Sequence, residues 1–128
     1  MAKAPPDGHT ILLTAPAAMA INPNLYAKLS YDALKDFAPI GMCSWLPYAL
    51  VVRADAGIHS LADLLARARA NPDKLSYSSS GNGTISHLLV VLLSQRADIK
   101  LNHIPYKGSA KAHTDLIGGQ VDLNFDTI

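Results

Sequence analysis

The sequence has few of the residues that would indicate a disulfide-bonded, nucleic-acid-binding or membrane-spanning protein. Cys43 is the single cysteine, so no disulfide can form within the chain. It lies in an apolar run, where we expect a small core residue. The 11 Lys and Arg nearly balance the 10 Asp and Glu, and none form a basic run, which argues against nucleic acid and anionic membrane as main partners. The longest uninterrupted apolar run, residues 88–93, is far below the roughly 20 residues of a transmembrane helix.

The amino-terminal segment only imitates a secretion signal. Lys3 precedes an apolar stretch at residues 11–21, and residues 18–20 resemble a cleavage site. However, Asp7 places an acid ahead of the apolar stretch, and Pro16 interrupts it. We therefore expect no export signal in the sequence as given, which would place this chain in the cytoplasm.

Strand and helix patterns alternate along the chain. Short apolar or β-branched runs predict strands at residues 11–14, 40–45, 49–53, 75–79, 101–105 and 121–125. Residues 40–45 and 49–53 form either two strands or one long strand bent at Pro47. Asn22 followed by Pro23 predicts a short helix that ends near residue 29. Ser60 with Asp63 predicts the start of a helix that residues 71–73 stop. Further helices are expected from residue 85 to 95, apolar on nearly all sides, and at 109–117, closed by two glycines.

This alternation predicts an α/β fold with a mostly parallel sheet covered by helices on both faces. In such sheets, ligands bind outside the carboxyl ends of the strands. We expect three loops to meet there: residues 78–84, residues 106–109, and the segment from Asp126 onward.

The loop at residues 78–84 is the most informative segment. It joins a predicted strand to a predicted helix and contains Ser80, Gly81, Asn82, Gly83 and Thr84. Such a loop directs backbone N–H groups and the positive end of a helix dipole at one point, which favours an anion. It lacks the Gly-Lys-Ser/Thr ending of a phosphate-binding loop, so a carboxylate is the simpler ligand. Gly, Ser and Asn are also the ordinary residues of a tight turn, and that interpretation stays open here.

Six motifs are spread over the chain: PDGHTILL at 6–13, INPNLY at 21–26, YDALKDFAP at 31–39, SGNGTISHL at 80–88, IPYKGS at 104–109 and GGQVD at 118–122. Taken together, they resemble the Bug family, the TctC-like extracytoplasmic solute receptors of tripartite tricarboxylate transporters. The motifs occur in the order and at the spacing of that family, over essentially the whole chain.

The resemblance implies a two-lobed periplasmic binding protein of type II that closes on a small carboxylate. Against that template the chain is similar to a middle piece, truncated at both ends. Residues 1–45 resemble part of the first lobe and the start of the crossover, and residues 46–128 resemble most of the second, ligand-binding lobe. The family's signal peptide, first strand and first glycine-rich loop have no counterpart here. Family membership would make the protein periplasmic and would add membrane transporter subunits as partners of the full-length receptor.

The resemblance also implies which residues hold the carboxylate, through backbone amides, hydroxyls and water. In the loop after residue 79 these are Ser80, Gly81, Asn82, Gly83 and Thr84, with His87 as a hydrogen-bonding residue that faces the loop. A second loop contributes Tyr106, Lys107, Gly108 and Ser109, and Lys107 either neutralises a dicarboxylate or is a solvated surface charge. Asp126 either orients a group of the ligand or caps a following helix. In the first lobe the backbone around Ala15 is expected to face the cleft.

Three functional hypotheses follow. The first is a solute-binding receptor, or a piece of one, with no cofactor and no metal, because the five histidines lack a metal-ligand spacing. The second is an incomplete domain without independent binding, whose exposed apolar surface would cause self-association. The third is an α/β enzyme with an anionic substrate, for which only His87 or Asp126 could serve as the base. No pair of groups is evidently arranged for acid–base chemistry, and we therefore expect no enzyme.

Overall fold

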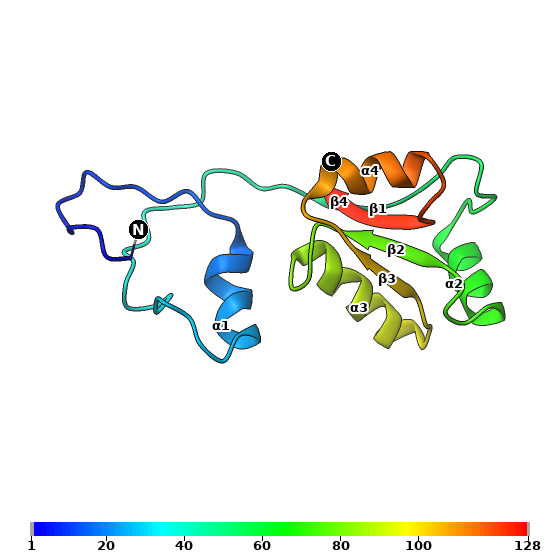
Figure 1. The fold of residues 1–128 in the computed structure, drawn as a ribbon, viewed down its shortest axis with the longest axis horizontal. Coiled ribbons are helices and arrows are strands. Elements are labelled where there is room, and N and C mark those ends of the chain that lie inside the picture. Colours follow the sequence, from blue (N-terminus) through cyan, green and yellow to red (C-terminus); the bar gives the residue numbers. More distant parts are fainter. Residues whose placement is uncertain (1, 128) are drawn as a thin grey trace. The chain divides into compact units, whose positions relative to one another are not determined.

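The computed structural model describes residues 2–127. The chain divides into two compact units, residues 1–45 and residues 46–128. Figure 1 shows the elements of each unit, and each unit is described here by itself.

The first unit contains two short helical segments and no buried side chain within them. A π-helical turn, η1 (Ala17–Ile21), runs directly into α1 (Asn22–Leu25). The α-helix begins at Asn22 as predicted, with Pro23 in its first turn. Asn22 is not its N-cap, however, because η1 precedes it and Asn22 donates its N–H to the Ala17 carbonyl. The predicted end near residue 29 was also too late by about one turn.

The strands predicted at residues 11–14 and 40–45 are not formed. Both segments are irregular, and their apolar side chains are exposed, including Leu13 (79%) and Ile40 (86%). In the part of the chain that the structure describes, neither segment pairs with a strand. A lone extended segment leaves its backbone groups unpaired, so apolar composition alone does not make it a strand. Cys43 lies in the second segment and is exposed, which corrects the expectation of a core cysteine.

The second unit is built on a four-stranded sheet in the order β1-β4-β2-β3. Its strands are β1 (Tyr48–Val52), β2 (Ser76–Ser79), β3 (Asn102–Pro105) and β4 (Leu123–Thr127). The central strand β2 is parallel to both β3 and β4, whereas β1 runs antiparallel to β4. The prediction of a mostly parallel sheet is therefore confirmed, and β4 begins two residues later than predicted.

Three helices cover this sheet, α2 (Leu61–Ala70), α3 (Ile85–Ala97) and α4 (Ser109–Ile117). The Ser60 side chain accepts a hydrogen bond from the Asp63 amide, which confirms the predicted cap. The Asp63 carboxylate accepts its hydrogen bond from the amide of His59, one residue before the cap. In Figure 1 the sheet lies between α3 and α4. A core on one face joins Leu64 of α2, Val90 of α3 and Leu123 of β4, all at most 1% exposed.

The expectation that α3 is covered on all sides holds only in part. Val90 is fully buried, but Leu92 is 49% exposed. Within residues 2–127, no helix has both the length and the apolar character that crossing a membrane requires.

Candidate functional site

The loops that follow β2 and β3 meet at one edge of the sheet. Because β2, β3 and β4 are parallel, their carboxyl ends lie at this edge. The Tyr106 amide donates to the Ser79 carbonyl at 3.0 Å, and the Gly108 amide donates to the Ser80 carbonyl at 3.2 Å. The two predicted site loops are thus joined by backbone hydrogen bonds.

The first loop has a conformation that requires its glycines. Gly81 has φ = 137° and Gly83 has φ = 76°, values that side-chain-bearing residues adopt only at a cost. The Thr84 hydroxyl donates to the Gly81 carbonyl at 2.7 Å, which closes the loop directly before α3. A Cβ on Gly81 would lie 3.4 Å from the Tyr106 carbonyl oxygen, so the second loop packs closely against the first. Asn82, at the tip, is exposed.

Three hydroxyl groups converge beneath this loop. Ser86, on the first turn of α3, is 3% exposed, and its Oγ accepts a hydrogen bond from the Ser80 amide at 3.1 Å. The same oxygen lies 3.1 Å from Ser80 Oγ and 3.0 Å from Thr84 Oγ1. The sequence analysis missed Ser86. A serine at the second position of a helix that follows a glycine loop is the signal that could have identified it.

The start of α3 has no side-chain cap. Thr84 occupies the N-cap position in extended geometry, but its hydroxyl is directed back into the loop, and among the described residues no side chain caps the helix. The first N–H groups of a helix need a partner, so this end of α3 favours an acceptor from outside the helix.

His87 contacts the loop rather than pointing away from it. Its Nδ1 accepts a hydrogen bond from the Gly83 amide at 3.2 Å. Gly83 is itself buried. His87 therefore lies where the sequence analysis expected a hydrogen-bonding residue that faces the loop.

The side chains of the second loop have different environments. The Tyr106 hydroxyl donates to Asp115 Oδ2 at 2.7 Å on α4, so it is directed along that helix. This hydrogen bond, followed by burial and the Asp115 charge, raises the pKa of the Tyr106 phenol. Lys107 is exposed, and Gly108, with φ = 105°, is the residue before α4.

Asp126 is surrounded by hydrogen-bond donors. His113 Nε2 lies 2.5 Å from its Oδ2, and the Thr127 amide donates to its Oδ1 at 2.8 Å. Burial alone would raise the pKa of Asp126, but hydrogen bonds from Thr127, His113 and Ser109 outweigh it and lower the pKa. The carboxylate thus joins the end of β4 to the first turns of α4, and no helix in the described residues follows it.

Two buried polar side chains near this edge also escaped the sequence analysis. Ser78 and Asn124 are opposite each other on β2 and β4 and are at most 2% exposed. Neither Ser78 Oγ nor Asn124 Oδ1 has a hydrogen-bond partner among the described residues. Polar residues inside a central strand were the available signal, since such positions are usually apolar. Ala15 belongs to the other unit, where its carbonyl accepts from the Ala18 amide.

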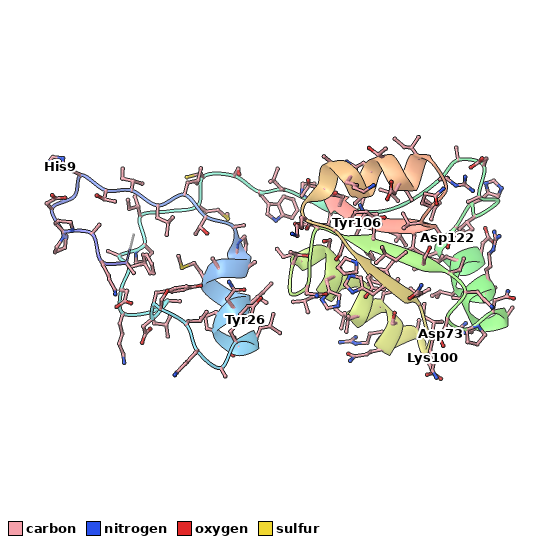
Figure 2. The ribbon with its side chains drawn as sticks, viewed as in Figure 1. His9, Tyr26, Asp73, Lys100, Tyr106 and Asp122 are labelled. Atoms are coloured by element: carbon pink, nitrogen blue, oxygen red, sulfur yellow. The ribbon has the colours of Figure 1, made fainter. Side chains whose placement is uncertain are left out.

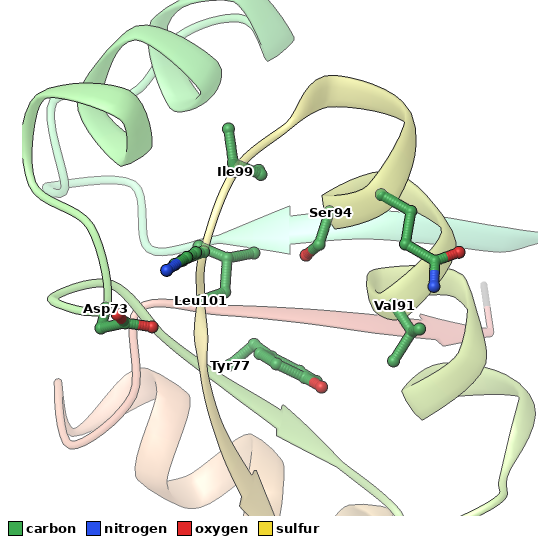
Figure 3. Close-up of a pocket in the computed structure, with 8 residues that line it drawn as sticks. Asp73, Tyr77, Val91, Ser94, Ile99 and Leu101 are labelled. Atoms are coloured by element: carbon green, nitrogen blue, oxygen red, sulfur yellow. The ribbon is translucent and has the colours of Figure 1, made fainter.

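A separate surface hollow of about 240 Å³ lies at the amino-terminal end of the strands. Figure 3 shows part of its lining, which includes Asp73, Tyr77 and Leu101. In Figure 2, Asp73 and Lys100 lie close together, away from Tyr106, which follows β3 at the edge of the sheet where the two site loops meet. Within residues 2–127, no group of three or more His, Cys, Asp or Glu side chains is arranged to hold a metal ion.

Comparisons with known proteins agree with the resemblance identified in the sequence. The model of the protein family described as "Tripartite tricarboxylate transporter family receptor" matches residues 1–128. A curated relative from Pseudomonas sp. (strain P51), the UPF0065 protein in the tcbD-tcbE intergenic region, is 42% identical over 128 residues, 100% of this chain and 38% of the relative.

Two solved structures extend the comparison to the fold. R. palustris Rpa4515 with adipate has a TM-score of 0.89 at 35% identity, over 98% of this chain and 42% of that one. The periplasmic binding protein BugD has a TM-score of 0.78 at 35% identity, over 87% and 37% of the two chains. The chain thus spans about two fifths of the length of these proteins, and the predicted fold class is confirmed.

Proposed function

Since the chain belongs to the family of tripartite tricarboxylate transporter receptors, we propose that it carries the carboxylate-binding lobe of a solute receptor. One carboxylate of the ligand binds at the start of α3, between the loop of residues 80–84 and the loop of residues 106–109. The ligand is a small carboxylate or dicarboxylate, as adipate is in the R. palustris structure. The family description names a receptor, and the role proposed here needs neither catalysis nor a cofactor.

Support for an anion at this point comes from the uncapped start of α3. Its dipole contributes roughly 0.3–1 kcal/mol to an anion near an exposed end. The positive φ values of Gly81 and Gly83 turn the backbone of the loop close to this position. No side chain of the described residues caps the first N–H groups of α3, and an external carboxylate would accept hydrogen bonds from them.

Ser80 is the hydroxyl best placed to donate to the ligand. The Thr84 proton is used on the Gly81 carbonyl. Ser86 can give its single proton either to Ser80 or to Thr84. When Ser86 donates to Ser80, the Ser80 proton is left for a carboxylate oxygen. The buried Ser86 hydroxyl then orients the Ser80 hydroxyl toward the ligand.

The remaining predicted residues take supporting roles in this proposal. Lys107 is exposed beside the site and neutralises a second carboxylate of the ligand. Tyr106 and Gly108 fix the position of the second loop, because their amides donate to the Ser79 and Ser80 carbonyls. The Tyr106 hydroxyl is used by Asp115. Asp126 holds α4 in place or orients a polar group of the ligand, but as an anion it does not bind a carboxylate directly.

We further propose that residues 46–128 form most of the second lobe of the receptor and residues 1–45 part of the first, with Ala15 facing the cleft. The full-length receptor would work in the periplasm with membrane subunits of its transporter. Enclosure between two lobes supplies much of a ligand's burial, so we expect this chain alone to bind weakly.

The test is a calorimetric titration of the purified, folded chain with mono-, di- and tricarboxylates, with adipate first and its neutral diamide as the uncharged control. We expect saturable heat for a dicarboxylate and none for the diamide. Lys107→Ala should weaken dicarboxylate binding, whereas Lys74→Ala, at a likewise exposed lysine at the other end of β2, should not. Equal heats for adipate and its diamide would contradict the proposal.

A second candidate, an incomplete domain that associates with itself, is favoured by the exposed apolar side chains of the first unit. Leu34 is 92% exposed and Met42 is 84% exposed. Apolar surface of this kind promotes association. Size-exclusion chromatography over a range of concentrations tests it. Concentration-dependent oligomers would support this candidate, and a monomer at all concentrations would contradict it.

A further inference from the structure

Three rings from three different elements are stacked beneath the loop of residues 80–84. The His87 ring of α3 lies on the His103 ring of β3, with centroids 4.4 Å apart and planes 13° apart. The His103 ring in turn lies on Tyr77 of β2, at 4.6 Å and 15°. We refer to His87 and His103 as the histidine pair.

Both histidines of the pair are connected to the loop by hydrogen bonds. His87 reaches it directly, since its Nδ1 accepts from the Gly83 amide at 3.2 Å. His103 reaches it through Ser79, whose Oγ lies 2.7 Å from His103 Nε2. Ser79 Oγ also accepts from the Gly81 amide at 3.3 Å. Hydrogen bonds therefore connect the histidine pair to both glycines of the loop, to Gly83 directly and to Gly81 through Ser79.

The bond to Gly83 exists only while His87 is neutral. An acceptor at Nδ1 carries no proton, so the proton of the neutral ring lies on Nε2. A protonated ring has donors on both nitrogens and would face the Gly83 N–H with a second N–H. Protonation of His87 thus converts an attraction into a repulsion at the centre of the loop.

The groups that stack on the pair or form hydrogen bonds with it are uncharged. Its neighbours are the other ring, Tyr77 from β2, Ser79 and the Gly83 amide. Among residues 2–127, no carboxylate forms a hydrogen bond or an ion pair with either ring. Burial, followed by the charge of His87, lowers the pKa of His103. Charge on both stacked rings at once is therefore strongly disfavoured.

We propose that His87 and His103 are positioning residues for the carboxylate loop, and that protonation of His87 releases Gly83, so that carboxylate affinity falls as the solution becomes mildly acidic. The proposal rests on the proposed function for its ligand, but its effect on the loop does not. Histidine is the side chain whose charge ordinarily changes between pH 5 and 8. A single carboxylate stays ionised above about pH 6. The His87→Asn variant separates any protonation of a dicarboxylate ligand from a change in the protein.

The first measurement uses the ligand-free, 15N-labelled full chain. Backbone amide and histidine ring signals are followed by NMR from about pH 8 to 5, the range in which histidine titrates. We expect the Gly83 amide to shift with the same midpoint as the His87 ring. In His87→Asn, whose side-chain oxygen replaces Nδ1 as an acceptor but does not titrate, the Gly83 shift should disappear. A Gly83 amide that does not respond to pH, or responds equally in His87→Asn, would overturn the proposal.

The second measurement is adipate titration at pH 7.5 and 6.0. We expect affinity to be lower at pH 6.0 than at pH 7.5, by no more than the roughly 2- to 10-fold effect of one lost hydrogen bond. His87→Asn should bind equally at both pH values, and His87→Leu should bind weakly at both. His59→Asn, at an exposed histidine far along the chain, should retain the full pH response. Loss of the pH response in His59→Asn, or its persistence in His87→Asn, would contradict the assignment. No binding of any mono-, di- or tricarboxylate of the panel at pH 7.5 would refute the proposed function, and the ligand-free titration would still decide the positioning role.

Discussion

Gly81→Ala is the substitution that tests the loop most selectively. At φ = 137° an alanine is strained whatever the space around it, and its Cβ would lie 3.4 Å from the Tyr106 carbonyl oxygen and 3.8 Å from Thr84 Cγ2. These distances are ordinary contacts, so the methyl group fits without a clash. The perturbation is therefore one of backbone conformation, which the chain can relieve only by moving the loop.

The expected cost in stability is about 1–3 kcal/mol, the range for a residue held in a sparsely populated backbone region. A domain stable by about 5–15 kcal/mol remains folded after such a loss. Relief of the strain would displace two backbone groups of residue 81. These are the carbonyl that accepts a hydrogen bond from the Thr84 hydroxyl and the amide that donates one to Ser79 Oγ. Binding would have to restore the strained conformation, and about 1.4 kcal/mol corresponds to a factor of ten, so we expect adipate affinity to fall about fivefold or more.

Gly57→Ala is the matched control. Gly57 has φ = 65°, it lies between β1 and α2, and no heavy atom lies within 4 Å of the position that the alanine methyl group would take. Both variants should lower the midpoint of urea unfolding, but only Gly81→Ala should weaken binding in calorimetry. A folded Gly81→Ala protein with unchanged affinity would refute the reasoning, as would an equal loss of affinity in Gly57→Ala.

Three further predictions concern stability. Ser60→Ala removes the cap of α2 and should cost about 1 kcal/mol in urea unfolding, while Ser60→Thr should cost less; equal losses would contradict the cap. The pKa of Asp126 is lowered, so its carboxylate stabilises the fold above the ordinary carboxyl pKa, and this contribution is lost as the pH falls through the lowered value. Asp126→Asn should therefore be less stable than the parent at pH 7 but should lose less stability on acidification, whereas the exposed Asp55→Asn should follow the parent curve. Hydrogen exchange should be fast in residues 2–45, which contribute nothing to the hydrophobic core, and slow around Val90 and Leu123; slow exchange in the first unit would contradict the structure.

Local signals in the sequence predicted the elements whose causes are local. Ser60 and Asp63 specified the start of α2, and the two glycines after Ile117 specified the end of α4. The alternation of elements also placed two loops at one sheet edge. The failures were segments whose structure depends on distant partners. Residues 11–14 and 40–45 have strand composition, but in the described residues no strand pairs with them.

The candidate site was predictable in outline and not in detail. The glycine loop was identified from the residues, because a strand–loop–helix segment has a defined geometry, whereas Lys107 was named only through the family resemblance. Ser86 was missed because its role depends on contacts with Ser80 and Thr84 that only the folded loop creates. The stacking of His87 on His103 joins residues on different elements, so no local pattern indicates it.

The most direct test of the central claim is a map of backbone amide shifts in the 15N-labelled chain during titration with adipate. The account predicts the largest changes in residues 80–87, with smaller changes in residues 106–109, and none of them with the neutral diamide. Changes confined to the hollow beside Asp73 and Lys100, at the other end of the strands, would contradict it.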